Sequence, residues 1–169
     1  MSEFVPVNTD PFTPEARHIV VVAGGLGDPS STKLLADRLT KAATAEFSSH
    51  GIVPEVHTVE LRLLANAISD ALVTHNNSHA LAEAIDQVEQ DDGIITTTPT
   101  FKASYSGLFK SFWDLIDDKA LVNIPVLLGA TGGTQRHSLM LDMAMRPLFG
   151  YLRAKVIPHA VFAASDDWG

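Results

Sequence analysis

The chain has 169 residues, a length typical of one domain, and its 46% hydrophobic content indicates a globular protein. A formal net charge of -8 disfavours nucleic acid as a partner, and the absence of cysteine excludes disulfides and cysteine-ligated iron–sulfur clusters. No apolar run approaches the roughly 20 residues of a membrane span. Since the N-terminus lacks the basic and apolar regions of a signal peptide, we expect a cytoplasmic protein.

The first part of the chain predicts an arm and then a domain. Residues 1–16 contain three prolines and no hydrophobic periodicity, which favours a flexible arm, and 17–169 form the domain. The run 17–24 (RHIVVVAG) is apolar throughout, as in a parallel strand buried on both faces. A loop rich in small residues follows, and a helix with apolar residues at helical spacing then runs to about Ser49.

The middle of the chain predicts two further strands and two helices. Residues 54–61 favour an edge strand, because Pro54 cannot donate a ladder hydrogen bond. Short helices are expected at 63–73 and at 78–90, where Ser78 is the predicted N-cap. Residues 93–98 form the predicted central strand.

The last part of the chain continues the alternation. We expect a broadly apolar helix at 106–119, buried within the protein or against another subunit, and a strand at 124–130. A helix at 137–153 should be kinked or broken by Pro147. Residues 155–163 form the last predicted strand, again at an edge because of Pro158.

This alternation predicts an α/β three-layer sandwich with a five-stranded parallel sheet. Edge positions for the second and fifth strands agree with the order 2-1-3-4-5. The helix that should close such a fold is missing after Ser165-Asp166-Asp167. We therefore hypothesise that the sequence lacks a C-terminal helix, or that a partner subunit covers that face.

Three loops follow strands one, three and four, which are neighbours in this order, so ligands are expected there. Each loop also has a simpler interpretation as ordinary capping or turn structure. The first offers hydroxyls at a helix N-terminus, which favours an anion such as phosphate, although Asp28 would repel it and Lys33 would offset that charge. The second combines hydroxyls with two aromatic rings, and the third has two glycines that permit a close backbone approach. The residues concerned are Ser30, Ser31 and Thr32; Pro99, Thr100, Phe101, Ser104 and Tyr105; and Thr131, Gly132 and Gly133.

Other motifs are weak or missing. Gly25-x-Gly27-x-x-Ser30 is a near match to the dinucleotide fingerprint, but Glu60 lies too far along the chain for the expected acidic partner. The histidines lack zinc spacing such as H-E-x-x-H, so no metal site is predicted. A nucleophile elbow is also missing, and no catalytic acid or base is assigned.

The stretches 24–39, 98–117 and 130–154 (GGLGDPSSTKLLADRL, TPTFKASYSGLFKSFWDLID and ATGGTQRHSLMLDMAMRPLFGYLRA) resemble the NAD(P)H-dependent FMN reductases of the flavodoxin-like superfamily. The similarity is greatest to the actinobacterial branch that partners luciferase-like flavin monooxygenases. It implies that the first loop holds the FMN phosphate, the second lines the ribityl chain and the isoalloxazine, and the third meets the pyrimidine side of the ring. Many relatives have an arginine where this chain has Gly27-Asp28, which suits an enzyme that releases its flavin.

The implied activity is hydride transfer from NADH or NADPH to FMN, followed by delivery of reduced FMN to a monooxygenase. Arg136 and His137 are candidates for contacting the nicotinamide nucleotide, and a homodimer or homotetramer is expected. Three alternatives stay open at this stage. They are a quinone or azo reductase that retains FMN, a non-enzymatic flavodoxin-like electron carrier, and an NAD-binding module.

Overall fold

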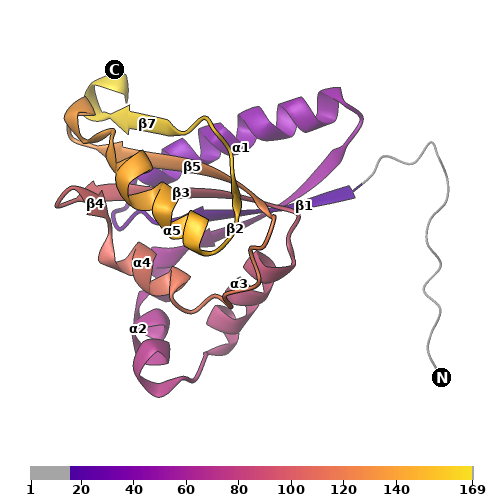
Figure 1. Ribbon diagram of the computed structural model, residues 1–169, viewed down its shortest axis with the longest axis vertical. Coiled ribbons are helices and arrows are strands. Elements are labelled where there is room, and N and C mark those ends of the chain that lie inside the picture. Colours follow the sequence, from indigo (N-terminus) through magenta and orange to yellow (C-terminus); the bar gives the residue numbers. More distant parts are fainter. Residues whose placement is uncertain (1–15, 169) are drawn as a thin grey trace.

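A parallel β-sheet forms the middle layer of the molecule in the computed structural model, which describes residues 16–168 (Figure 1). The order of the main path is β2-β1-β3-β5-β6, and β7 also pairs in parallel with β5. The strands are β1 (Ala16–Ala23), β2 (Val53–Glu60), β3 (Gly93–Phe101), β4 (Ser104–Tyr105), β5 (Pro125–Gly132), β6 (Lys155–Val156) and β7 (Val161–Ala164). The predicted order 2-1-3-4-5 is confirmed, with β6 and β7 together in the place of the fifth strand.

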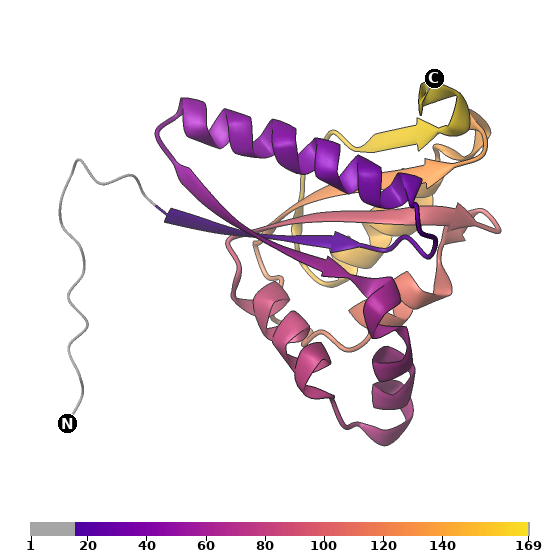
Figure 2. The same ribbon diagram turned by 180° about the vertical axis from the view of Figure 1, so that it is seen from behind.

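Helices cover the two faces of the sheet unequally (Figures 1 and 2). In the described residues, α1 alone packs on one face, against β1, β3 and β5, and the other helices pack on the opposite face. The helices are α1 (Ser31–Ser49), α2 (Ala65–Thr74), α3 (His79–Gln90), α4 (Gly107–Trp113) and α5 (Arg146–Tyr151). Residues 1–15 of the predicted arm lie outside the described residues.

Alternation along β1 divides the core between these faces. Val20 and Val22 belong to the larger apolar cluster below α2–α5, whereas Ile19 and Val21 belong to the smaller cluster below α1. Beside α1, an apolar cavity of 330 Å³ is open against the sheet, with Phe47 among its lining residues. No helix between residues 16 and 168 is both long enough and apolar enough to cross a membrane.

The helix predicted at 106–119 is shorter in the structure, because α4 ends at Trp113. Asp117 accounts for part of this difference: its side chain accepts a hydrogen bond from the Lys119 backbone N–H at 2.8 Å, and its own N–H donates to Glu89 at 2.9 Å. Such side-chain bonds compete with helix continuation. Trp113 is 1% exposed and packs edge-on against Phe149, with the ring centroids 4.8 Å apart. The broad apolar face of α4 is therefore buried within this chain.

The segment predicted as one helix at 137–153 is irregular rather than broken at Pro147, because a π-helical turn runs directly into the α-helix that contains this proline. A 3₁₀ turn spans Gln135–His137, a π-helical turn spans Leu141–Met145, and α5 begins at Arg146. Pro147 lies directly after this π-helical turn, in which the Arg146 N–H donates to the Leu141 carbonyl, and π-helical turns are one known site of helix irregularity.

The last predicted strand is divided into β6 and β7 around Pro158. The Arg146 guanidinium donates hydrogen bonds to the carbonyls of Ile157 and Pro158, both at 3.1 Å. These carbonyls are thus satisfied by a side chain, and the chain leaves the sheet between the two short strands. A 3₁₀ turn at Ser165–Trp168 follows β7.

Candidate functional site

A cleft of 430 Å³ lies beyond the carboxyl ends of β1, β3 and β5. Nine of the eleven residues predicted to hold the flavin line it, so the structure brings the three loops together. The lining residues are Leu26, Gly27, Pro29, Ser30, Ser31, Thr32, Pro99, Thr100, Phe101, Thr131, Gly132, Gly133, Ser165 and Trp168.

The first loop presents the N-terminus of α1 to the cleft. Ser30 is the N-cap, and its hydroxyl oxygen accepts a hydrogen bond from the Lys33 N–H at 3.1 Å. The first N–H groups of a helix have no intrahelical carbonyl, so those of Ser31 and Thr32 are available to a ligand. Gly25 allows this tight arrangement, because a Cβ there would lie 2.1 Å from the Ser30 hydroxyl. The geometry and the helix dipole both suit an anion.

Buried threonines join the loops to one another. The hydroxyls of Thr32 and Thr131 are 2.7 Å apart, and the Thr97 hydroxyl donates to the Thr32 carbonyl at 3.2 Å. Thr32 and Thr131 are both less than 5% exposed. Their side chains therefore fix the first and third loops relative to each other, which is a positioning role that the sequence did not indicate.

The second loop is a β-hairpin formed by β3 and β4. Thr100 pairs with Tyr105 and Phe101 pairs with Ser104 across this hairpin. The Thr100 hydroxyl is buried without a hydrogen-bond partner, and Phe101 is half exposed at the rim of the cleft. A ligand that offers an acceptor or donor would satisfy the Thr100 hydroxyl.

Ser104 and Tyr105 are the two predicted flavin-binding residues that do not line the cleft. Both lie in β4, and the Tyr105 ring packs 5.8 Å from that of Phe109 over the core. Their position follows from the hairpin: β4 turns back antiparallel to β3 and moves these side chains off the cleft.

The third loop follows β5 and brings backbone close to the second loop. A Cβ on Gly132 would lie 2.8 Å from the Phe162 ring and 3.5 Å from the Thr100 hydroxyl, so only glycine allows the third loop to pack this closely on β7 and on the second loop. Arg136 and His137 lie on the exposed 3₁₀ turn beyond this loop and are not among the residues that line the cleft.

Charges beside the first loop are paired. Asp28 accepts a hydrogen bond from the Arg62 guanidinium at 3.3 Å, and Arg62 also contacts Glu60 at 3.3 Å. Lys33 instead pairs with Asp37 on α1. Arg62, rather than Lys33, therefore offsets the Asp28 charge.

Leu26, Pro29, Ser165 and Trp168 line the cleft but were not predicted from the sequence. Trp168 is held by Arg38, whose guanidinium carbon lies 4.7 Å from the ring centroid. Asp167 anchors the turn before it by accepting from the Ala164 N–H at 2.7 Å. A lone tryptophan near the end of the sequence has no local pattern that would place it here.

Comparison with known proteins assigns the chain to a family. The family model described as NADPH-dependent FMN reductase matches residues 17–169. The chain belongs to the NADPH-dependent FMN reductase family. It is a flavodoxin-like oxidoreductase that uses FMN and NAD(P)H.

Individual relatives of this FMN reductase agree with the assignment. The NADH-dependent FMN reductase SfnE of Pseudomonas putida is 40% identical over 150 residues, which are 89% of this chain and 78% of that protein. An FMN reductase (NADPH) of Pseudomonas aeruginosa is 36% identical over 160 residues, which are 95% of this chain and 81% of that protein. A crystal structure of an oxidoreductase from Corynebacterium diphtheriae superposes with a TM-score of 0.89 at 43% identity and covers 92% of this chain and 85% of that one.

The residues of this cleft fit FMN. The available N–H groups and hydroxyls at the start of α1 suit a phosphate, and the unpartnered Thr100 hydroxyl lies at the middle loop. In the third loop a Cβ on Gly133 would meet no atom within 4 Å, so this loop leaves room for a planar group. The exposed Phe101 and the Trp168 ring add apolar surface for a flat ring system.

Proposed function

We propose that this FMN reductase binds FMN in the three-loop cleft, reduces it with NADH or NADPH, and releases the reduced flavin to a flavin-dependent monooxygenase. The observation that carries the assignment of the cleft is the buried, unpartnered Thr100 hydroxyl between a free helix N-terminus and the Gly132 backbone. When bound, FMN supplies the hydride-accepting chemistry, and the protein supplies binding and orientation.

Each loop has a separate role in this proposal. Ser30, Ser31 and the first N–H groups of α1 bind the phosphate, and the Thr32–Thr131 hydrogen bond holds the first and third loops at the correct separation. Thr100 donates to or accepts from the flavin, and Gly133, where a Cβ would meet no atom within 4 Å, permits the backbone of the third loop to approach it. Phe101 covers the edge of the cleft. A hydride transfer needs ring stacking and exclusion of water rather than a protein acid or base, so these residues position and shield.

Release of the flavin is supported by the lack of cationic side chains in the part of the cleft where we place the FMN phosphate. No arginine or lysine lies among the fourteen residues that line the cleft. The neighbouring cations have other partners: Arg62 pairs with Asp28 and Glu60, Lys33 pairs with Asp37, and Arg38 stacks on Trp168. An FMN phosphate would thus be held by neutral hydrogen-bond donors, which bind it less strongly than a bidentate guanidinium would. Weak retention suits a protein that supplies reduced FMN to another enzyme.

The activity test follows NADH and NADPH oxidation with and without added free FMN. We expect oxidation that depends on free FMN, with reduced FMN detected in a filtrate from which the protein has been removed under anaerobic conditions. Tightly retained flavin that reduces added quinone, without FMN in the filtrate, would favour a quinone reductase. Bound flavin without NAD(P)H oxidation would favour an electron carrier and contradict the proposal.

The site test replaces Thr100 by valine. Because a net hydrogen bond contributes roughly 0.5–1.5 kcal/mol, T100V should raise the FMN dissociation constant about 2- to 12-fold. Thr58→Val is a matched control, since Thr58 is exposed on β2 and away from the cleft. Fluorescence titration of FMN measures both variants. Equal affinities for T100V and wild type would place the flavin elsewhere.

A further inference from the structure

A second polar cluster lies on β1 and β2, near the amino ends of the strands. His18 on β1 pairs in register with Glu55 on β2, and His57 follows two residues later. Alternate residues of a strand share a face, so Glu55 and His57 lie on the same side of β2. His18 lies on the same face of β1 as Val20 and Val22, which is the face covered by α3.

The three side chains converge on one point. His18 Nδ1 lies 3.7 Å from one Glu55 carboxylate oxygen, and His57 Nε2 lies 3.6 Å from the other. One potential ligand atom from each of the three residues lies within 4.8 Å of the other two. The imidazole rings are nearly parallel, with 6° between their planes and centroids 6.4 Å apart. One ring nitrogen of each histidine thus lies within 4 Å of the Glu55 carboxylate that stands between them.

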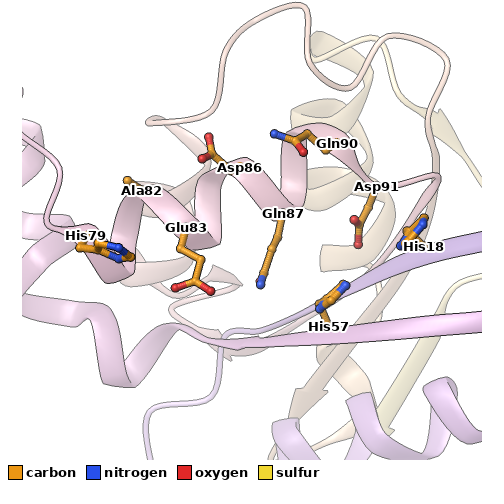
Figure 3. Close-up of a pocket in the computed structure, with 9 residues that line it drawn as sticks. All are labelled: His18, His57, His79, Ala82, Glu83, Asp86, Gln87, Gln90 and Asp91. Atoms are coloured by element: carbon orange, nitrogen blue, oxygen red, sulfur yellow. The ribbon is translucent and has the colours of Figure 1, made fainter. Parts of the chain in front are cut away.

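A buried carboxylate beside this cluster points to a ligand independently. Asp91 follows α3, is 7% exposed, and its Oδ2 is buried without a hydrogen-bond partner. Figure 3 shows its side chain together with His18 and His57 at one end of a pocket of 640 Å³ along α3. An unpartnered buried anion is costly, and a nearby cation would relieve that cost.

The backbone around His18 is fixed. The Asp92 N–H donates to the His18 carbonyl at 2.8 Å, and the His18 N–H donates to the Asp92 carboxylate at 2.9 Å. The link between α3 and β3 is therefore tied to β1 at the level of the cluster. These hydrogen bonds fix the backbone of His18 relative to that of Asp92, and so also relative to the adjacent Asp91.

We propose that His18, Glu55 and His57 bind a divalent transition-metal ion of the class Zn²⁺, Co²⁺ or Ni²⁺, with Asp91 as the buried carboxylate that balances its charge. Imidazole nitrogens select this class over Mg²⁺ and Ca²⁺, which prefer oxygen ligands. Metal–ligand distances of about 2.0–2.2 Å require the partly exposed side chains to move closer, and at least one imidazole to rotate so that both rings direct a nitrogen at the ion. Two carboxylates match the charge of the ion, and the pocket leaves room for water as a further ligand.

This site is separate from the flavin cleft. It lies near the amino ends of β1 and β2, whereas the cleft lies beyond the carboxyl ends of β1, β3 and β5. A bound ion would link β1 to the edge strand β2, so it should stabilise the fold. Since the ligands come together through strand register, the spacing of histidines along the sequence predicted no metal site.

The test uses untagged protein treated with EDTA and then freed of the chelator. ZnCl₂ is titrated by calorimetry, and CoCl₂ by the visible absorption of the bound ion. We expect one ion per chain, and a rise in Tm of roughly 5–10 °C at a free Zn²⁺ concentration 100 times the dissociation constant. Asp91→Asn should weaken binding about 10-fold or more, as expected for a residue beside the ligands.

Variants His18→Gln and His57→Gln should lose at least 10-fold in Zn²⁺ affinity. His50→Gln is the matched control, because His50 lies 3.7 Å from Glu46 on α1 but belongs to no three-residue cluster among the described residues. Circular dichroism and FMN titration without metal verify that each variant is folded. Wild-type protein that binds no Zn²⁺, or binds it no better than the His18→Gln/His57→Gln double variant, would overturn the proposal. An equal loss in His50→Gln would do the same.

Discussion

At the scale of single residues, the hydrogen bond between Thr32 and Thr131 determines the shape of the cleft. It joins residues 99 positions apart in the sequence and lies in the core of the site, where neither side chain is more than 4% exposed. The resemblance implied that Thr32 holds phosphate directly. In the structure the Thr32 hydroxyl bonds to that of Thr131, while Ser31 is exposed in the same turn.

A double-mutant cycle on this pair tests its positioning role. Either Thr32→Val or Thr131→Val leaves one buried hydroxyl without its partner, so each should lower the free energy of unfolding by about 1–3 kcal/mol. The double variant removes both hydroxyls and should cost little more than one single change. Urea denaturation measures all four proteins. Strictly additive losses would mean that the two hydroxyls stabilise the fold independently.

At the scale of elements, the hairpin between β3 and β4 has a strained turn. Lys102 and Ala103 have φ values of 50° and 65°, in the left-handed region that glycine and asparagine occupy most readily. Strain of this kind is often found next to functional sites. Here it turns β4 back along β3 and leaves Phe101 at the rim of the cleft.

Relief of that strain should stabilise the protein. Ala103→Gly should raise the free energy of unfolding by about 0.5–1 kcal/mol, since the left-handed penalty exceeds the entropy cost of glycine. Ala45→Gly on the exposed face of α1 is the matched control and should lower it by about 1 kcal/mol. Urea denaturation compares the two variants. Destabilisation by Ala103→Gly would show that the turn carries no strain.

The same hairpin marks where sequence patterns lose predictive power. Continuous apolar runs identified β1, β3 and β5, because strands buried on both faces carry little else. Pro147 marked a helix whose irregularity is a π-helical turn directly before the proline. A Lys-Ala turn has no hairpin signature, so β4 was not predicted. The early end of α4 and the division of the last strand depend on side chains, such as Glu89 and Arg146, that are distant in sequence from the atoms they bind.

At the scale of the whole molecule, the cleft was predictable because parallel strands bring their carboxyl ends to one edge. Nine predicted residues line it through topology alone. Trp168 reaches the cleft only because β7 returns alongside β5 and Arg38 holds the ring, and neither relation has a local sequence signal. The His18, Glu55 and His57 cluster likewise depends on strand register.

The surface that we expect to mediate self-association is not the face of α4 around Trp113 that the sequence suggested. Trp113 is buried inside the chain, so α4 offers no broad apolar face to a partner. Exposed apolar side chains gather instead around the π-helical turn and α5, where Leu139, Met143 and Tyr151 are 68%, 76% and 74% exposed. Large exposed apolar side chains in one region are typical of protein interfaces. We therefore expect a second copy of this chain to cover this region.

Met143→Asp tests this expectation. A charge at the centre of an apolar interface should raise the dissociation constant of the oligomer by roughly 30-fold or more, the effect of losing about 2 kcal/mol at a hot spot. Leu63→Asp is the matched control, because Leu63 is also 68% exposed but lies in a different segment, before α2. Size-exclusion chromatography with light scattering over a range of protein concentrations distinguishes the outcomes. Wild-type protein that is monomeric at every concentration, or a Met143→Asp variant that assembles as the wild type does, would show that these side chains are exposed for another reason.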